Sequence, residues 1–281
     1  MRAARYFPVE PGPLRVKAGL FRFGHDFGNG ADDARFFQVD AERDAYLAAK
    51  RAVPVERHQL DDSVGARRAV AAGLDFIAAT WAHEHPSLAC PVIVNEPARA
   101  RALRLAFTLQ EDFAIIRRGD EGVGDAVALF VCFPSGWRPE RLLRAAFSSI
   151  HGPVPGFSDD KLGRSMVATM IERGPFVRFV WTLCGDAVFD HHPDSWPQGQ
   201  RIRLEDAQAL FFRVERQVTI PLPAVDAAVF LIRTSITPTH ALGRDERSRL
   251  AQALSAMSDE IAAYKGLLAG KAHALRLLGA P

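Results

Sequence analysis

Three long strand-like runs in the second half of the chain constrain its fold more than any other feature. They are Phe176–Leu183, Ala209–Ile220 and Ala227–Ile236, and each is rich in β-branched and aromatic residues. The last two runs are joined by Pro221-Leu-Pro-Ala224, which is short enough for a hairpin. An antiparallel sheet is therefore expected in this half of the chain.

Two earlier runs extend this pattern and suggest a topology. Leu105–Ile116 and Ala126–Phe133 are also strand-like, and the turn signal Arg117–Gly124 separates them. The order is then two strands, helices, and three strands. This is the order of a PAS-like α+β domain, in which a helical flap follows the second strand of a five-stranded antiparallel sheet and leaves a ligand cavity. Other α+β folds share this order.

Helical patterns surround the predicted sheet. In the flap, one helix is expected after Trp137, with Pro139 in its first turn and a buried face up to Ile150, and another is expected between Ser158 and Gly174. We expect residues 1–104 to form an N-terminal arm and helices, 105–240 the core, and 241–281 one long C-terminal helix. All three parts are expected to make one compact unit.

Composition excludes several classes of protein. The 281 residues are 48% hydrophobic and 24% charged, which is typical of a globular chain, and the net charge of +2 argues against a nucleic-acid partner. No run is apolar enough for a signal peptide or a membrane span. The three cysteines have no metal-site or disulfide spacing, so a reducing cytoplasm is expected.

Prolines and glycines restrict the backbone around one histidine, His151. The segment Phe130–Trp137 ends a strand in a proline turn, and Ile150-His-Gly-Pro-Val-Pro-Gly156 follows the next helical pattern. The prolines and glycines fix the path of the chain just after His151. The residues alone leave two interpretations: His151 is a ligand held at a fixed tilt, or it caps the last carbonyls of its helix.

Seven pieces of the sequence, spread over residues 110–234, occur in the order found in one known family. They are Gln110-Glu-Asp112, Phe133-Pro-Ser-Gly-Trp137, Ile150-His-Gly-Pro-Val-Pro155, Arg178 with Trp181, Arg213-Val-Glu-Arg-Gln217, Leu222-Pro223 and Ile232-Arg-Thr234. In these pieces the chain resembles the haem-dependent oxidative N-demethylase alpha-subunit family.

The resemblance implies haem b in a PAS-like fold, and activation of O2 for oxidative demethylation of a small secondary amine such as dimethylamine, with release of formaldehyde. It also implies electrons from a separate reductase that carries FMN and an iron–sulfur cluster, and this chain has no motif for either group. Whether tetrahydrofolate accepts the one-carbon product is left open. Two other functions remain: a haem-based gas or redox sensor, and a haem-free PAS-like binding module.

The resemblance assigns roles to particular residues. His151 becomes the expected iron ligand, with His191 and His192 as alternatives that we expect to be exposed in a polar loop, and with Cys132 and Cys184 expected in the core. Trp137 and Trp181 are expected to contact the porphyrin, although large aromatic residues more often belong to a core.

A row of polar residues on one strand supplies the other candidates. Side chains two apart on a strand share a face, so Arg213, Glu215 and Gln217 should point together. We expect Glu215, Gln217 and Arg178 to be catalytic, with Glu215 binding a protonated amine or relaying a proton. Arg213 and Arg233 are expected to contact haem. The alternative is a cross-strand ladder of ion pairs.

Two further positions bear on the substrate and on the sheet. The family has Asn where this chain has Val180, on the same strand face as Arg178, so a different substrate is expected before a different cofactor. Glu111 and Asp112 are adjacent in the first predicted strand, so at most one of them is expected to point inward.

Overall fold

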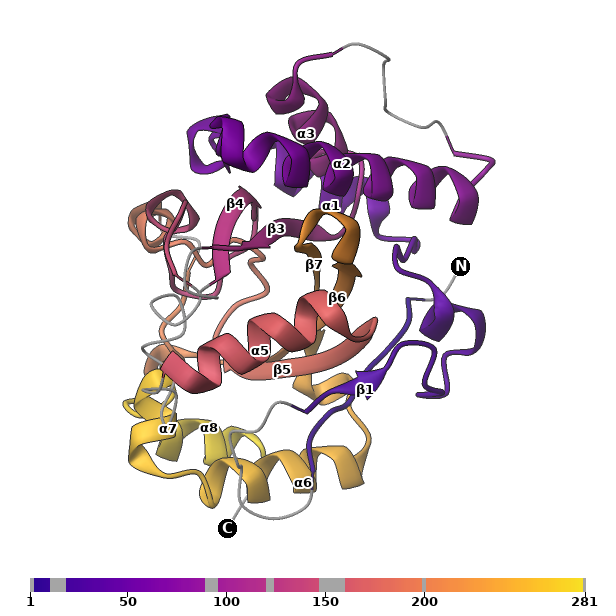
Figure 1. Cartoon of the computed structure of the whole chain (residues 1–281). Coiled ribbons are helices and arrows are strands. Elements are labelled where there is room, and N and C mark those ends of the chain that lie inside the picture. Colours follow the sequence, from indigo (N-terminus) through magenta and orange to yellow (C-terminus); the bar gives the residue numbers. More distant parts are fainter. Residues whose placement is uncertain are drawn as a thin grey trace.

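A seven-stranded sheet, in which all neighbours run antiparallel, forms the centre of the computed structural model (Figure 1). The structure describes residues 3–10, 19–88, 96–119, 124–146, 160–198 and 201–279. The strand order is β1-β5-β6-β7-β3-β4-β2. The strands are β1 (Phe21–Arg22), β2 (Gln59–Leu60), β3 (Asp112–Arg118), β4 (Gly124–Phe130), β5 (Phe176–Cys184), β6 (Phe211–Leu222) and β7 (Ala227–Pro238).

The sheet corrects the predicted count of five strands. The five predicted runs form β3 to β7, and the additional strands β1 and β2 contain two residues each and pair with β5 and β4. The first predicted run also began too early. Leu105 and Ala106 end a helix, and the chain becomes extended only at Asp112.

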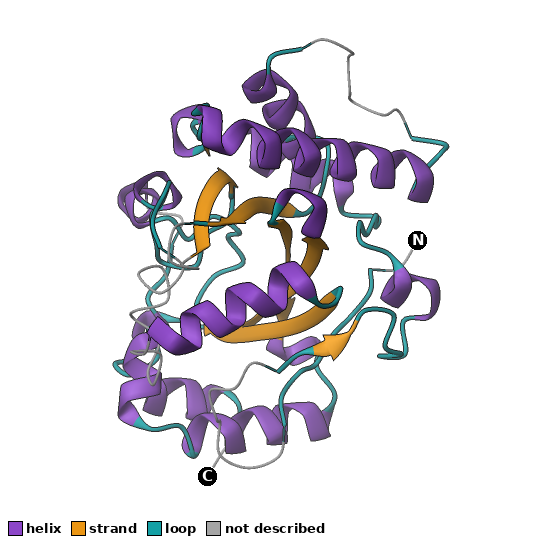
Figure 2. Ribbon diagram, viewed as in Figure 1, coloured by secondary structure: helices purple, strands orange, loops and turns teal. Residues whose placement is uncertain are grey.

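Helices cover both sides of the curved sheet (Figure 2). On one face, α2 and α3 pack in a single core with sheet residues such as Phe113, Ile115 and Leu231. On the other face, Val167 of α5 packs against Ile116 of β3 and Ala228 of β7. The helices are α1 (Arg43–Arg51), α2 (Val64–Glu84), α3 (Ala98–Ala106), α5 (Asp160–Glu172), α6 (Arg244–Ser255), α7 (Asp259–Tyr264) and α8 (Lys271–Leu277).

A glycine permits the close approach of α5 to the sheet. A Cβ atom added at Gly124, the first residue of β4, would lie 2.7 Å from Cγ2 of Val167. Real Cβ atoms do not approach a neighbour so closely, so a larger residue here would push the helix away.

The C-terminal region is three short helices, which corrects the prediction of one long helix. Ser258 begins α7 as its N-cap, since its hydroxyl accepts a hydrogen bond from the Ile261 N–H. Gly266 then adopts a positive φ of 69°, which ends that helix. These helices pack against β5 and β6 around Trp181 and Phe212 (Figure 1).

The helix predicted after Trp137 is also corrected, as far as the structure describes it. Only a short 3-10 turn, Pro139–Arg141, forms there. Arg144 then takes a positive φ of 61° and pairs with Asp61, and Ala146 bridges to Asp125. Residues 147–159, including His151, lie outside the described residues. Among the described helices, none has the length and apolar character required to cross a bilayer.

Candidate functional site

One face of β5 and β6 gathers polar side chains in the middle of the sheet. The register places Arg178 opposite Gln217 and Val180 opposite Glu215. We call this the polar face and define it by Arg178, Val180, Arg213, Glu215 and Gln217. It is the face on which α5 packs farther along the sheet.

Glu215 occupies the centre of the polar face. Gln217 Nε2 donates a hydrogen bond to its Oε2 at 3.0 Å, and Arg213 Nη2 lies 3.6 Å from its Oε1. The side chain is 14% exposed although β6 is an interior strand, so the carboxylate remains accessible. A carboxylate held in this way can bind a cation or accept a proton.

The side chain of Arg213 links two loops by hydrogen bonds. Its Nη1 donates to the Phe189 carbonyl and its Nη2 to the Phe133 carbonyl, each at 2.8 Å. The residue is 1% exposed. Both terminal nitrogens are therefore engaged by the protein itself, which does not favour the expected role of Arg213 as a partner of a haem propionate.

Arg178 has a different environment. It is partly buried, and within the described part of the chain it makes no hydrogen bond or ion pair. Burial lowers the pKa of its guanidinium, and the nearby charge of Glu215 acts in the opposite direction. A desolvated cation on this face, without a partner among the described residues, is a position suited to an anionic group.

Two other expected haem contacts lie on the opposite face. Arg233 pairs with Asp40 at 2.7 Å and stacks 4.2 Å from the Tyr46 ring centre. Trp181 is 5% exposed and packs against Phe212 in the core of the C-terminal helices. Both residues lie on the opposite face because successive side chains along a strand point to alternate faces of the sheet. The structure places neither residue beside Glu215.

Trp137 lies in the loop that follows β4. It is partly buried, and it follows Gly136, whose φ is +83°. The Gly136 N–H donates to the His191 carbonyl at 3.0 Å, and Ser135 forms a β-bridge with the same residue. The loop of Trp137 is thus fixed to the loop before η5 (Pro193–Gln198).

The expectation that His191 and His192 are exposed is wrong. They are 6% and 1% exposed. His191 Nε2 lies 3.5 Å from Asp186 Oδ1, and burial lowers its pKa to about 4 despite that carboxylate. Sequence position in a polar loop did not reveal this burial, because it depends on contacts with the distant loop of Trp137. There the Gly136 N–H bonds the His191 carbonyl, and Glu140 lies beside the His192 ring.

A cluster of Glu140, His192 and Asp194 brings possible metal ligands within 4.8 Å of one another. Its atoms already bind one another, however. The Asp194 N–H donates to His192 Nδ1 at 3.1 Å, so the ring carries its proton on Nε2, which lies 3.2 Å from Glu140. Arg138 pairs with Asp194. This arrangement is a network of internal bonds.

The two cysteines seen in strand-like runs are buried and free of disulfides. Burial raises the pKa of Cys184 to about 11 and that of Cys132 well above its usual value. Neither thiol therefore offers a thiolate near neutral pH.

Gln110, Glu111 and Asp112 are all buried, which corrects the prediction that at most one of the two acids points inward. Alternation did not apply because β3 begins only at Asp112. Glu111 accepts from the Gln38 N–H at 2.9 Å, and Gln110 from the Asp40 N–H at 3.2 Å. These residues hold the N-terminal segment against the sheet.

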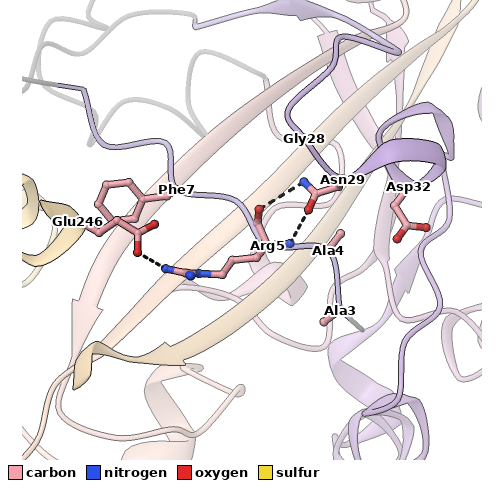
Figure 3. Close-up of a pocket in the computed structure, with 8 residues that line it drawn as sticks. All are labelled: Ala3, Ala4, Arg5, Phe7, Gly28, Asn29, Asp32 and Glu246. Carbon is pink, nitrogen blue, oxygen red and sulfur yellow. Dashed lines mark hydrogen bonds and ion pairs between the residues drawn. The ribbon is translucent and has the colours of Figure 1, made fainter. Parts of the chain in front are cut away.

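A depression of about 410 Å³ lies away from the polar face, where the N-terminal segment meets α6 (Figure 3). Arg5 pairs with Glu246, and its N–H donates to Asn29 Oδ1 at 3.0 Å. Figure 3 shows these groups turned toward one another. We interpret the depression as a surface gap between two packed segments, and not as a binding site.

Comparison with protein families adds one finding. Residues 35–275 match the family described as haem-dependent oxidative N-demethylase, alpha subunit-like. The match covers the sheet from β2 to β7 and most of the helices packed on it. No curated protein matches the chain.

Proposed function

Because the chain belongs to the haem-dependent oxidative N-demethylase alpha subunit-like family, we propose that it removes an N-methyl group from a small secondary amine such as dimethylamine. The cofactor in this proposal is haem b within a PAS-like core, and the electrons come from a separate reductase with FMN and an iron–sulfur cluster. Dimethylamine and O2, with electrons and protons, then give methylamine, formaldehyde and water. The family match over residues 35–275 carries the proposal.

The residues of the polar face fit a haem group. Haem presents propionate carboxylates, and Arg178 offers a partly buried guanidinium without an ion pair in the described part of the chain. His151 is the proposed iron ligand, on the basis of the sequence alone, since it lies outside the described residues. When bound, haem supplies the iron that activates oxygen.

The protein's own groups bind and orient the amine. At neutral pH a secondary amine is protonated, and the accessible carboxylate of Glu215 provides the opposite charge. Gln217 and Arg213 hold that carboxylate in place, at 3.0 and 3.6 Å. Val180 lies opposite Glu215 on β5 and adds an apolar surface beside it, which suits a methyl group.

The experiment that tests the proposal measures two properties of the purified protein. A reduced-minus-CO difference spectrum reports bound haem, and formaldehyde release from dimethylamine with a surrogate reductase reports turnover. We expect both signals. Haem without formaldehyde would favour the sensor function, and the absence of haem would contradict both functions.

A further inference from the structure

The C-terminal region reaches the polar face at the edge of β5. Lys265 follows α7 directly, and its Nζ donates to the Trp181 carbonyl at 2.7 Å. The Thr182 hydroxyl in turn donates to the Lys265 carbonyl at 3.4 Å. Thr182 lies two residues beyond Val180, so its side chain shares the polar face. These two bonds hold Lys265 next to the site.

Lys265 and Arg178 are two partly buried cations, and Lys265 Nζ also lies 5.5 Å from the Trp181 ring centre. Neither makes an ion pair with a carboxylate in the part of the chain that the structure describes. Both lie in the field of Glu215, whose oxygens are already bound by Gln217 and faced by Arg213. Burial lowers the pKa of Lys265 to about 8, while the charge of Glu215 opposes this change.

Partly desolvated cations are costly unless an anion joins them. We propose that Arg178 and Lys265 together form a binding position for a carboxylate group. The inference rests on the proposed function, and it identifies two sources of the carboxylate. One is a haem propionate. The other is a substrate with its own carboxylate, such as an N-methyl amino acid, whose ammonium group would face Glu215.

The first arm of the test separates the haem source. Ferric haem and haem dimethyl ester, which lacks the free propionates, are titrated into the protein and followed by absorption. If the carboxylate is a propionate, Lys265→Gln and Arg178→Gln each weaken haem binding by about tenfold, as expected for a lost charge-assisted bond, and leave ester binding unchanged.

The second arm separates the substrate source. Calorimetry measures the binding of N-methylglycine and of dimethylamine to the same proteins, with or without haem. If the carboxylate belongs to the substrate, both variants lose about tenfold in affinity for N-methylglycine and keep their affinity for dimethylamine. Haem binding is then the same in all of the proteins.

Lys271→Gln is the matched control. Lys271 Nζ donates to the Met257 carbonyl at 2.6 Å, so this variant loses the same kind of bond in the same region, away from the polar face. It should bind every probe as the wild type does. Variants of Arg178 and Lys265 that match the wild type in both arms would overturn the inference.

The experiment distinguishes failure of the proposed function from failure of this inference. A wild-type protein that takes up neither haem nor its ester contradicts the proposed function. The calorimetric arm still decides the inference in that case, because loss of N-methylglycine binding in the variants supports it and unchanged or absent binding overturns it.

Discussion

Lys50 Nζ lies 3.0 Å from Asp112 Oδ1, and the two side chains are 0% and 1% exposed. Burial alone would lower the pKa of Lys50, but the charge of Asp112 raises it above the usual value. The other oxygen of Asp112 accepts the Phe133 N–H at 2.9 Å. This ion pair therefore joins α1 to β3 and to the loop that leads to Trp137.

Replacing Lys50 with Met should destabilise the protein by about 3–5 kcal/mol, because Asp112 is left buried and unpaired. Urea unfolding at neutral pH measures the change. Arg118→Gln is the control, since Arg118 pairs with Asp226 and Glu172 at the surface, and about 1 kcal/mol or less is expected. Equal effects of the two substitutions would contradict the assigned role of the buried pair.

Arg213→Gln should cost about 2–4 kcal/mol, because the buried Phe133 carbonyl and the partly buried Phe189 carbonyl lose their donors. Hydrogen exchange should increase in both loops that Arg213 joins, at residues 131–137 and 186–191. Arg68→Gln serves as the control, since Arg68 is exposed and donates to the Ala224 carbonyl at the surface. Faster exchange in only one loop would show that Arg213 does not connect them.

The stability of the protein should fall as the pH decreases below about 6.5, in part because of His58. Burial lowers the pKa of His58 to about 4 in the folded state, against 6.5 for the free side chain. Between these values the unfolded chain binds a proton that the folded chain does not, so unfolding becomes easier as the pH falls.

His58→Phe keeps a ring that can stack on Phe130, as His58 does with an interplanar angle of 8°. When the pH is lowered from 7 to 5, the free energy of unfolding should fall by about 2 kcal/mol more in the wild type than in the variant. Chemical unfolding at both pH values gives this difference. If both proteins lose the same amount, His58 is protonated equally in the folded and unfolded states.

Glu215→Gln should reduce formaldehyde release from dimethylamine by about a hundredfold, because the variant lacks the charge that holds the amine and accepts a proton. Haem content should be unchanged. Exposed Glu260 provides the control, and Glu260→Gln should be fully active. Normal turnover by Glu215→Gln would exclude the carboxylate from the reaction.

Much of the sheet could be predicted from the sequence, because β5, β6 and β7 carry long runs of β-branched and aromatic residues. The grouping of Arg213, Glu215 and Gln217 followed from strand alternation alone. Strand alternation also separates Arg233 from this group. In the β6–β7 register it lies opposite Arg216, whose side chain points to the other face. Motif resemblance placed these residues in one site without regard to that alternation.

Other features depend on contacts between distant segments. The approach of Lys265 to β5 requires the breaks on either side of α7, for which Ser258 and Gly266 were the available signals within a continuous apolar pattern. The burial of His191 depends on its bridge to Ser135, which is remote in sequence. No local pattern near His191 indicates such a contact.

The most direct test of the central claim is the absorption spectrum of the protein purified from cells supplied with a haem precursor. The account predicts a Soret band in the wild type and its loss in His151→Ala, with the band retained in His240→Ala, a change at an exposed histidine. A wild-type protein without a Soret band, or a His151→Ala variant that retains it in full, would contradict the account.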